Sequence, residues 1–247
     1  MTKTEIHDIR ALADRRGRNE QGLFIAEGMK LVSEIGVSPL TLHKIYVSSD
    51  TAATAFPEAE RITPAQMERI SQLATPADVL ATVVIPQRDL RSADPAHELV
   101  LALDGVQNPG NLGTLIRLAD WFGISDIVCS AACADCFNPK VVQATMGAIL
   151  RVRVHYTDLG AWLSAQRRGG VDICGTFLDG ENIHNAALSP AGVLVMGSEG
   201  RGISPACAAS VNRRLCIPPY PADRRGSESL NVAVAAAIAC AEFRRRP

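Results

Sequence analysis

The stretch that decides the fold begins at Leu99-Val-Leu-Ala-Leu-Asp-Gly-Val106 and continues through Gln107-Asn-Pro-Gly-Asn-Leu-Gly113 to Thr114-Leu-Ile-Arg-Leu-Ala-Asp-Trp-Phe-Gly123. The first part is short and apolar, which is typical of a strand buried on both faces of a parallel sheet. Asn-Pro and two glycines in the second part indicate a loop. We therefore predict a strand, a loop and a helix, with Asn111 as the helix N-cap and Gly123 at its end.

The helix of this stretch is predicted to be amphipathic, with Arg117 on its polar face. The apolar face is formed at helical spacing by Leu115, Leu118, Ala119 and Phe122. A glycine-rich turn at a helix N-terminus suits an anion, and a nearby arginine adds a bidentate phosphate fork. The stretch is neither a Gly-x-Gly-x-x-Gly motif nor a P-loop. An ordinary strand–helix turn with a solvated arginine is the alternative interpretation.

Composition is that of a globular chain with a substantial core. The 247 residues are 47% hydrophobic and 21% charged, and the net charge is −1. Nucleic-acid binding would therefore need a local basic surface. No signal peptide is visible, and the apolar run near Leu230–Ala241 is too short to span a bilayer. Seven cysteines without a secretory signal favour reduced thiols, so we expect a cytoplasmic protein that does not enter the membrane.

Strand and helix patterns alternate after residue 98, which predicts an α/β domain with a mostly parallel sheet. Helices are expected at Lys140–Ile149 and Ser204–Asn212, among others. Pro86–Pro95 carries charges and prolines without an apolar pattern, so it is the best linker candidate. We predict a smaller domain over residues 1–95, a linker at about 86–97, and a second domain over 98–247.

Two later stretches could supply further functional groups. In Val193-Leu-Val-Met-Gly-Ser-Glu-Gly-Arg-Gly202, a strand ends in a tight glycine-rich loop that fixes Glu199 where α/β sheets bind ligands. An exposed glutamate in an ordinary turn is the alternative. In Ser227-Glu-Ser-Leu-Asn-Val-Ala-Val-Ala235, Ser229 or Asn231 could cap the last helix. One helix needs one cap, so at least one of these side chains should be free to bind something.

Together the three stretches resemble the SpoU (TrmH-type) branch of the SPOUT superfamily. The first motif corresponds to Asn108–Arg117, the second to Met196–Gly202, and the third to Ile217-Pro218 with Ser229-Leu-Asn231. The third motif is longer here than usual, over residues 219–228. This resemblance covers residues 98–247 and implies a deep trefoil knot in that domain. The N-terminal part is similar to a substrate-binding domain related to ribosomal protein L30e.

The resemblance implies an S-adenosylmethionine-dependent enzyme that methylates ribose 2′-OH groups in RNA and works as a homodimer without a metal. Ribosomal RNA is favoured over transfer RNA because the N-terminal domain is similar to a ribosomal protein. A non-catalytic RNA-binding protein of the same fold is one alternative, and methylation of a base is another.

The resemblance also assigns site residues. The catalytic group would be Asn111, Arg117, Glu199, Ser229 and Asn231. The cofactor would contact Thr176, Met196, Gly197, Gly202, Ile217, Pro218, Leu230 and Asn231. The phosphate candidates are Arg15, Arg16, Arg18, Arg224 and Arg225. Arg117 would either act as the base that deprotonates the hydroxyl or position a phosphate and stabilise alkoxide charge. A guanidinium almost never deprotonates in proteins, which weighs against the first role.

The cysteines raise one further possibility. Cys129, Cys133 and Cys136 have a C-x3-C-x2-C spacing that resembles the cluster motif of radical S-adenosylmethionine enzymes. The barrel in which that motif normally lies is not indicated here. The five histidines form no spaced cluster either. We therefore predict no metal site.

Overall fold

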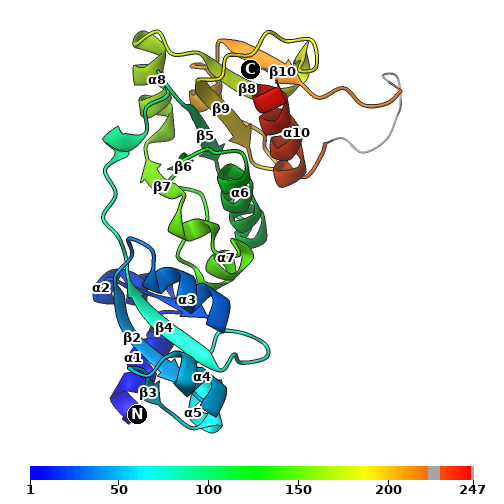
Figure 1. Ribbon diagram of the computed structural model, residues 1–247. Coiled ribbons are helices and arrows are strands. Elements are labelled where there is room, and N and C mark those ends of the chain that lie inside the picture. Colours follow the sequence, from blue (N-terminus) through cyan, green and yellow to red (C-terminus); the bar gives the residue numbers. More distant parts are fainter. Residues whose placement is uncertain (222–228, 246–247) are drawn as a thin grey trace. The chain divides into compact units, whose positions relative to one another are not determined.

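The computed structural model describes residues 1–221 and 229–245 (Figure 1). Two compact units make up the chain. The first contains Met1–Gln87 together with Asp135–Leu150, and the second contains Arg88–Ala134 and Arg151–Pro247. The segment 135–150 is therefore part of the first unit, although it lies beyond the domain boundary that the sequence suggested near residue 95.

The first unit is a small sheet with helices packed on it. Its strand order is β1-β4-β2-β3, and the strands are β1 (Leu23–Glu27), β2 (Leu42–Val47), β3 (Glu60–Arg61) and β4 (Val79–Val84). Its helices are α1 (Lys3–Ala11), α2 (Arg15–Gln21), α3 (Met29–Gly36), α4 (Asp50–Ala55), α5 (Pro64–Ile70), α7 (Pro139–Ala144) and the 3-10 turn η2 (Ala148–Leu150). Strand β4 is antiparallel to both neighbours, and one apolar core joins α1 and α5 to the sheet.

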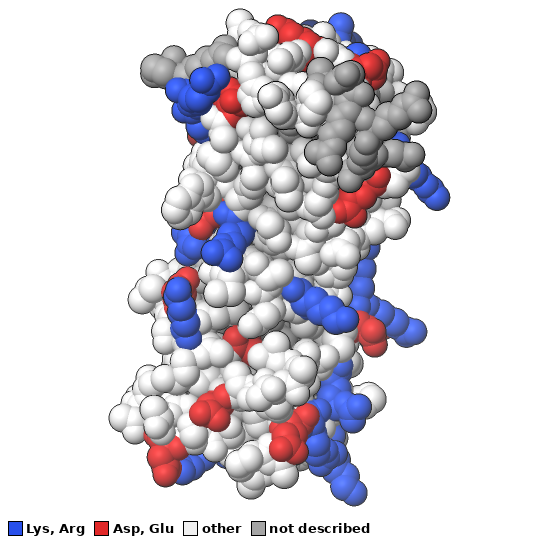
Figure 2. All heavy atoms as spheres, turned by 90° about the vertical axis from the view of Figure 1, so that its right-hand side faces the viewer, with Lys and Arg blue, Asp and Glu red and all other residues white. Residues whose placement is uncertain are grey.

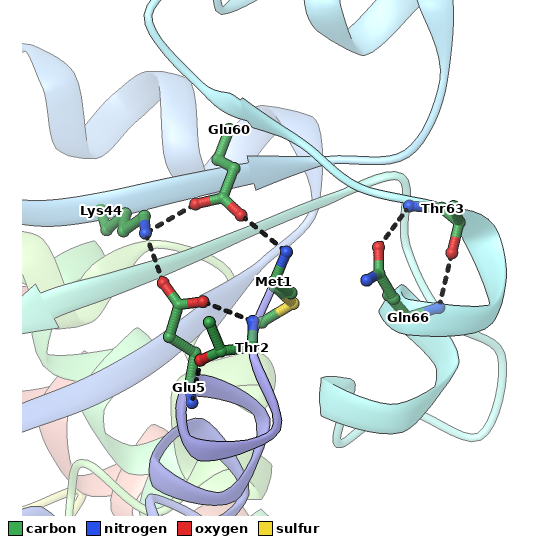
Figure 3. A network of polar contacts seen from close by, with 7 residues as sticks. All are labelled: Met1, Thr2, Glu5, Lys44, Glu60, Thr63 and Gln66. Atoms are coloured by element: carbon green, nitrogen blue, oxygen red, sulfur yellow. Dashed lines mark hydrogen bonds and ion pairs between the residues drawn. The ribbon is translucent and has the colours of Figure 1, made fainter.

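Helix α1 is fixed to the sheet by polar contacts at its start (Figure 3). Thr2 and Glu5 form a capping box, in which Thr2 Oγ1 accepts from the Glu5 backbone N–H at 3.1 Å. The Lys44 ammonium on β2 lies 3.0 Å from Glu5 and 2.6 Å from Glu60 on β3. Hydrogen bonds from the Thr2 backbone and from Lys44 lower the pKa of Glu5 to about 2. One lysine thus links a helix to two strands.

Segment 135–150 is built into the interior of the first unit. The ring of Phe137 lies 4.7 Å from that of Phe24, which is fully buried on β1. The helix predicted at Lys140–Ile149 is interrupted, because α7 ends at Ala144. Met146 has φ 51° and Gly147 has φ 92°, and a helix cannot continue through two left-handed residues.

The second unit is organised around a parallel sheet of six strands. Its order is β10-β8-β9-β5-β6-β7, and the strands are β5 (Leu99–Asp104), β6 (Asp126–Ser130), β7 (Arg153–Thr157), β8 (Ile173–Asn182), β9 (Gly192–Gly197) and β10 (Arg213–Cys216). Its helices are α6 (Pro109–Trp121), α8 (Leu159–Arg168), α9 (Pro205–Ala208), α10 (Val232–Arg245) and the 3-10 turn η1 (Leu90–Ser92).

All strand pairs of this sheet are parallel, which confirms the predicted α/β class. Strand β5 lies between β9 and β6, and all but the last residue of β5 and of β9 is buried. Covered strands of this kind read as continuous apolar runs, and that pattern made them recognisable in the sequence. The trefoil knot stays a prediction.

Helices α6 and α10 pack side by side and run in the same direction (Figure 1). At one end, Asn231 before α10 contacts Asn111 of α6. At the other end, the Arg244 guanidinium donates to the carbonyl of Phe122, just after α6.

Within residues 1–221 and 229–245, no helix has the length and apolar character that crossing a membrane requires. Helix α9 is shorter than the predicted Ser204–Asn212, since it ends at Ala208.

Candidate active site

The first loop of the site follows β5 and leads into α6. Gly105 has φ 68°, a conformation that favours glycine. The N-cap of α6 is Asn108, whose side chain accepts from the Asn111 backbone N–H at 3.1 Å. The predicted cap at Asn111 was therefore wrong. Asn108 precedes Pro109, and proline at the first helical position was the stronger signal. As a result, the Asn111 side-chain amide is free for other contacts.

The second loop follows β9 and presents Glu199 at its tip. Ser198 and Gly202 close its base through two backbone hydrogen bonds, of 3.1 and 2.8 Å. The chain is so tight here that a Cβ on Gly197 would lie 2.1 Å from the Gly202 carbonyl carbon. Only glycine fits at that crossing. The loop is therefore a short rigid turn, which agrees with the interpretation of Glu199 as a fixed carboxylate.

The third segment enters α10. Asn231 is the cap of this helix, since its Oδ1 accepts from the backbone N–H groups of Ala233 at 3.0 Å and Val234 at 3.3 Å. Of the two alternatives, Asn231 thus takes the capping position, while Ser229 lies exposed just before it. Because its oxygen faces the helix, the NH₂ group of Asn231 must point the other way.

These three segments converge on one carboxylate oxygen. Asn111 Nδ2 donates to Glu199 Oε1 at 2.7 Å, and Asn231 Nδ2 donates to the same oxygen at 2.6 Å. Asn231 Nδ2 also lies 3.2 Å from Asn111 Oδ1. The N-terminal ends of α6 and α10 both supply residues to this carboxylate, and helix N-termini favour negative charge. The arrangement fixes one acceptor oxygen between two side-chain amides.

A cavity of about 630 Å³ adjoins this trio. It is lined by the end of β5, the first two loops, one residue after β6 and the starts of α9 and α10, namely by Asp104, Gly105, Val106, Gln107, Asn108, Asn111, Ala132, Ser198, Glu199, Gly200, Arg201, Gly202, Ser204, Pro205 and Val232. Asp104 was missed by sequence reasoning. Its Oδ2 accepts from the Ser204 backbone N–H at 2.8 Å, so it holds the second loop against the end of β5. A carboxylate at the end of a central strand was the available signal.

Arg117 lies on the exposed face of α6, as predicted, roughly two turns from the helix start. Its guanidinium makes no hydrogen bond or ion pair to any residue in the described part of the chain, and it does not line the cavity. The structure therefore leaves Arg117 free to contact a ligand outside the Asn111–Glu199–Asn231 trio.

The predicted cofactor contacts come from three neighbouring strands. Thr176 lies on β8, Met196 and Gly197 end β9, and Ile217 follows β10. Since β10, β8 and β9 are adjacent and parallel, their carboxyl ends lie at one edge of the sheet. Thr176 Oγ1 contacts Met196 Sδ at 3.6 Å. The predicted contacts that remain, Gly202, Pro218, Leu230 and Asn231, lie in the loops beyond this edge.

Among the phosphate candidates, Arg18 requires a correction. Its side chain is 1% exposed, and its guanidinium donates to Asp135 Oδ2 and to the carbonyls of Leu12 and Ala13. A guanidinium with all these partners inside the protein cannot reach a nucleic-acid phosphate. Charge alternation in the sequence gave no sign of this burial, because Asp135 is distant along the chain.

The other phosphate candidates stay predictions. Arg15 and Arg16 are exposed on α2, and Arg16 pairs with Glu20 at 2.7 Å. Arg224 and Arg225 lie outside the described residues. Figure 2 shows one face of the molecule, on which the basic side chains form small groups, most of them with an acidic side chain beside them.

The three clustered cysteines are all buried. Cys129 is buried on β6, and the Cys133 thiol donates to the Leu103 carbonyl at 3.2 Å. Cys136 is buried in the first unit. Within residues 1–221 and 229–245, no group of three or more His, Cys, Asp or Glu side chains is placed to hold a metal ion.

A parallel α/β unit with a polar trio at the carboxyl ends of its strands is typical of a ligand-binding domain. The model of the SpoU rRNA Methylase family matches residues 98–241, and that of the MRM3-like substrate binding domain matches residues 3–81. The chain therefore belongs to the SpoU rRNA methylase family.

Individual relatives are similar over nearly the whole chain. The 23S rRNA (guanosine(2553)-2'-O)-methyltransferase RlmP of Bacillus subtilis is 30% identical over 239 residues, which are 95% of this chain and 93% of that protein. A solved putative RNA methyltransferase of the TrmH family from Porphyromonas gingivalis is 38% identical, with a TM-score of 0.89 over 100% of this chain and 99% of that one. An AdoMet-bound rRNA methyltransferase from Sinorhizobium meliloti is 28% identical, with a TM-score of 0.87 over 99% and 95%.

Proposed function

We propose that this protein transfers a methyl group from S-adenosylmethionine to a ribose 2′-OH of ribosomal RNA. Family membership supports the reaction class, and the name of the Bacillus subtilis relative supports the ribosomal substrate. The observation that carries the proposal is the Asn111–Glu199–Asn231 trio. It joins three motifs that are far apart in the sequence at one carboxylate oxygen.

The trio and Arg117 divide the work on the RNA. Glu199 Oε1 is held by two amides, so the carboxylate is fixed and its other oxygen can accept a hydrogen bond from a ribose hydroxyl. Arg117 presents a planar fork of donors that suits a phosphate and developing alkoxide charge. Because a guanidinium stays protonated, we assign it positioning and charge stabilisation, not proton abstraction.

The cofactor is placed at the carboxyl ends of β8, β9 and β10. Half-buried Ile217 and Pro218 and partly exposed Leu230 offer apolar surface there. These features fit a nucleoside with an attached sulfonium. When bound, S-adenosylmethionine supplies an electrophilic methyl group. The chain's own task is to align the ribose with it and to exclude water.

Calorimetry with S-adenosylmethionine tests the cofactor assignment. In the presence of a chelator the full chain should bind one equivalent per protomer, because the proposed contacts contain no metal ligand. Absence of binding under these conditions would contradict the assignment, as would an iron-dependent absorption in the purified protein.

Mapping of the product tests the reaction and the RNA class. Ribosomal RNA from cells lacking the gene should lose one 2′-O-methyl group, which the purified protein should restore. A restored methyl group on a base would overturn the 2′-O assignment. Restoration in transfer RNA alone would replace the ribosomal substrate, and RNA binding without transfer would favour a non-catalytic role.

The exposed apolar side chains of α6 and α10 support the proposal of a homodimer. Trp121 is 85% exposed and Val234 is 49% exposed, and they lie on two helices that pack together in the second unit. Large exposed apolar groups on adjacent helices are typical of an interface. Arg117 lies on the same pair of helices, so a second copy would help to enclose the site.

Light scattering on the full chain is expected to give a dimer, and Trp121→Glu should shift it to a monomer because a charge cannot be buried without a partner. Leu178→Glu is the matched control, since Leu178 is 78% exposed on β8 of the same unit. A monomeric wild-type protein at micromolar concentration would contradict the proposal. So would equal effects of the two variants.

We also assign the protein to the cytoplasm. All seven cysteines lie outside any disulfide, and six of them are buried. Reduced thiols are typical of a reducing compartment. Fluorescence microscopy of a tagged chain in its own host checks this assignment.

A further inference from the structure

The loop after β5 rests on a layer of side chains that the motifs do not include. Residues 130–134, which follow β6, lie directly behind Leu103–Val106. We propose that Ser130 and Cys133 are positioning residues that hold the backbone of this loop in the geometry that methyl transfer requires. The catalytic part of this inference rests on the proposed function, but the structural part does not.

The Cys133 sulfur is the centre of the contacts. It accepts from the Val106 backbone N–H at 3.3 Å and donates to the Leu103 carbonyl at 3.2 Å. Ser130 Oγ lies 3.7 Å from the same sulfur and accepts from the Gly105 backbone N–H at 3.0 Å. These two side chains thus bond the carbonyl of Leu103 and the backbone N–H groups of Gly105 and Val106.

The direction of these hydrogen bonds is self-consistent. Gly105 N–H donates to Ser130, the Ser130 hydroxyl can donate to Cys133, and the Cys133 thiol donates to Leu103. Each hydroxyl or thiol has one proton, and each is used once. A hydrogen bond with Cys129, and further ones with Ser130 and the loop amides, lower the pKa of Cys133 to about 7, although burial acts in the opposite direction.

The backbone of the following residues adds to the same support. The Ala134 N–H donates to the Val106 carbonyl at 2.9 Å, and the Tyr156 hydroxyl donates to the Ala134 carbonyl at 2.6 Å. Gly105 has a left-handed φ of 68°, which glycine adopts readily. The loop is thus fixed from behind on both sides of Gly105.

The position of this loop determines the position of the site. Gln107 and Asn108 line the cavity, and Asn108 caps the helix from which Asn111 reaches Glu199. A shift of Val106 is therefore passed on through a few residues to the trio. Small displacements of catalytic groups can lower a rate about 100-fold.

The experiment compares Cys133→Ala with Cys133→Ser in the full chain. Alanine leaves the Val106 N–H without a partner, so hydrogen exchange at that amide should accelerate at least about tenfold. The single-turnover methyl-transfer rate should fall about 10- to 100-fold with cofactor affinity unchanged. Serine keeps a donor and an acceptor at this position and should restore most of both.

Cys240→Ala is the control for the loss of a buried thiol. Cys240 is fully buried on α10, and its thiol makes no hydrogen bond to a residue of the described ranges. This variant should leave the hydrogen exchange of the Val106 amide and the transfer rate unchanged.

Unaltered exchange at the Val106 amide in Cys133→Ala would overturn the positioning role. So would a serine variant that is as slow as the alanine variant despite equal thermal stability. A wild-type protein without transferase activity would contradict the proposed function instead, and the exchange result would still decide the structural claim.

Discussion

Arg117→Ala is expected to lower the single-turnover rate of methyl transfer by at least about 100-fold, the lower range for a charge-stabilising or proton-transferring group. Cofactor affinity should stay unchanged, because Arg117 lies on α6 and none of the proposed cofactor contacts belongs to that helix. The fold should also be unaffected, since the side chain is exposed and substitutions of that kind usually change stability by less than about 0.5 kcal/mol.

Three further variants separate the proposed role of Arg117 from a general loss of charge and from cofactor binding. Arg117→Lys should restore little activity, because an ammonium keeps the charge but lacks the planar fork. Arg168→Ala removes an exposed arginine of α8 whose side chain bonds only Ser164 among the described residues, so it is the matched control. Asn231→Ala should differ from both by weakening the cofactor as well, since Asn231 caps α10 beside the proposed pocket. A near-wild-type rate in Arg117→Ala would transfer the catalytic role to Glu199 or Ser229.

The parts of the site that sequence reasoning predicted are those with local signals. Buried parallel strands are continuous apolar runs, so β5 and β9 were recognisable, and the tight loop around Glu199 follows from its glycines. Exposed Arg117 follows from helical periodicity. The convergence of Asn111, Glu199 and Asn231 came from family resemblance alone, because no local pattern links residues 88 and 120 positions apart.

The parts that could not be predicted depend on long-range packing. Ser130 and Cys133 look like an ordinary strand end and a loop, and only the path of the β5 loop shows what they bond. Asn108 and Asn111 are both good caps, and their competition is decided by Pro109. Arg18 was proposed as a phosphate ligand because no local pattern reveals its partner Asp135, which is 117 positions away.

That partner gives the second large prediction: Arg18→Ala should destabilise the first unit by about 3–5 kcal/mol, as breaking a buried ion pair does. Arg18 makes hydrogen bonds of 2.6 and 3.0 Å to Asp135 Oδ2 and of 2.8 Å to the carbonyls of Leu12 and Ala13. Alanine would leave the carboxylate and both carbonyls without this partner. It would also release segment 135–150, which Asp135 connects to α2.

Arg16→Ala is the control on the same helix, because Arg16 is 88% exposed and its surface ion pair with Glu20 should contribute little. The measurement must report on each unit separately, and the positions of the tryptophans make this possible. Both tryptophans, Trp121 and Trp162, belong to the second unit, so urea unfolding followed by tryptophan fluorescence should be unchanged in Arg18→Ala.

Hydrogen exchange in β1 and α7 reports on the first unit, and there the protection should fall steeply in Arg18→Ala and stay intact in Arg16→Ala. Asp135→Ala should have a similar effect, since it leaves the guanidinium buried without a counter-charge. Equal protection in Arg18→Ala and wild-type protein would show that the pair is dispensable. In that case the packing of Phe137 against Phe24 would have to anchor segment 135–150 by itself. If the pair is required, residues 1–95 alone lack Asp135 and Phe137 and should be less stable than the same residues within the full chain.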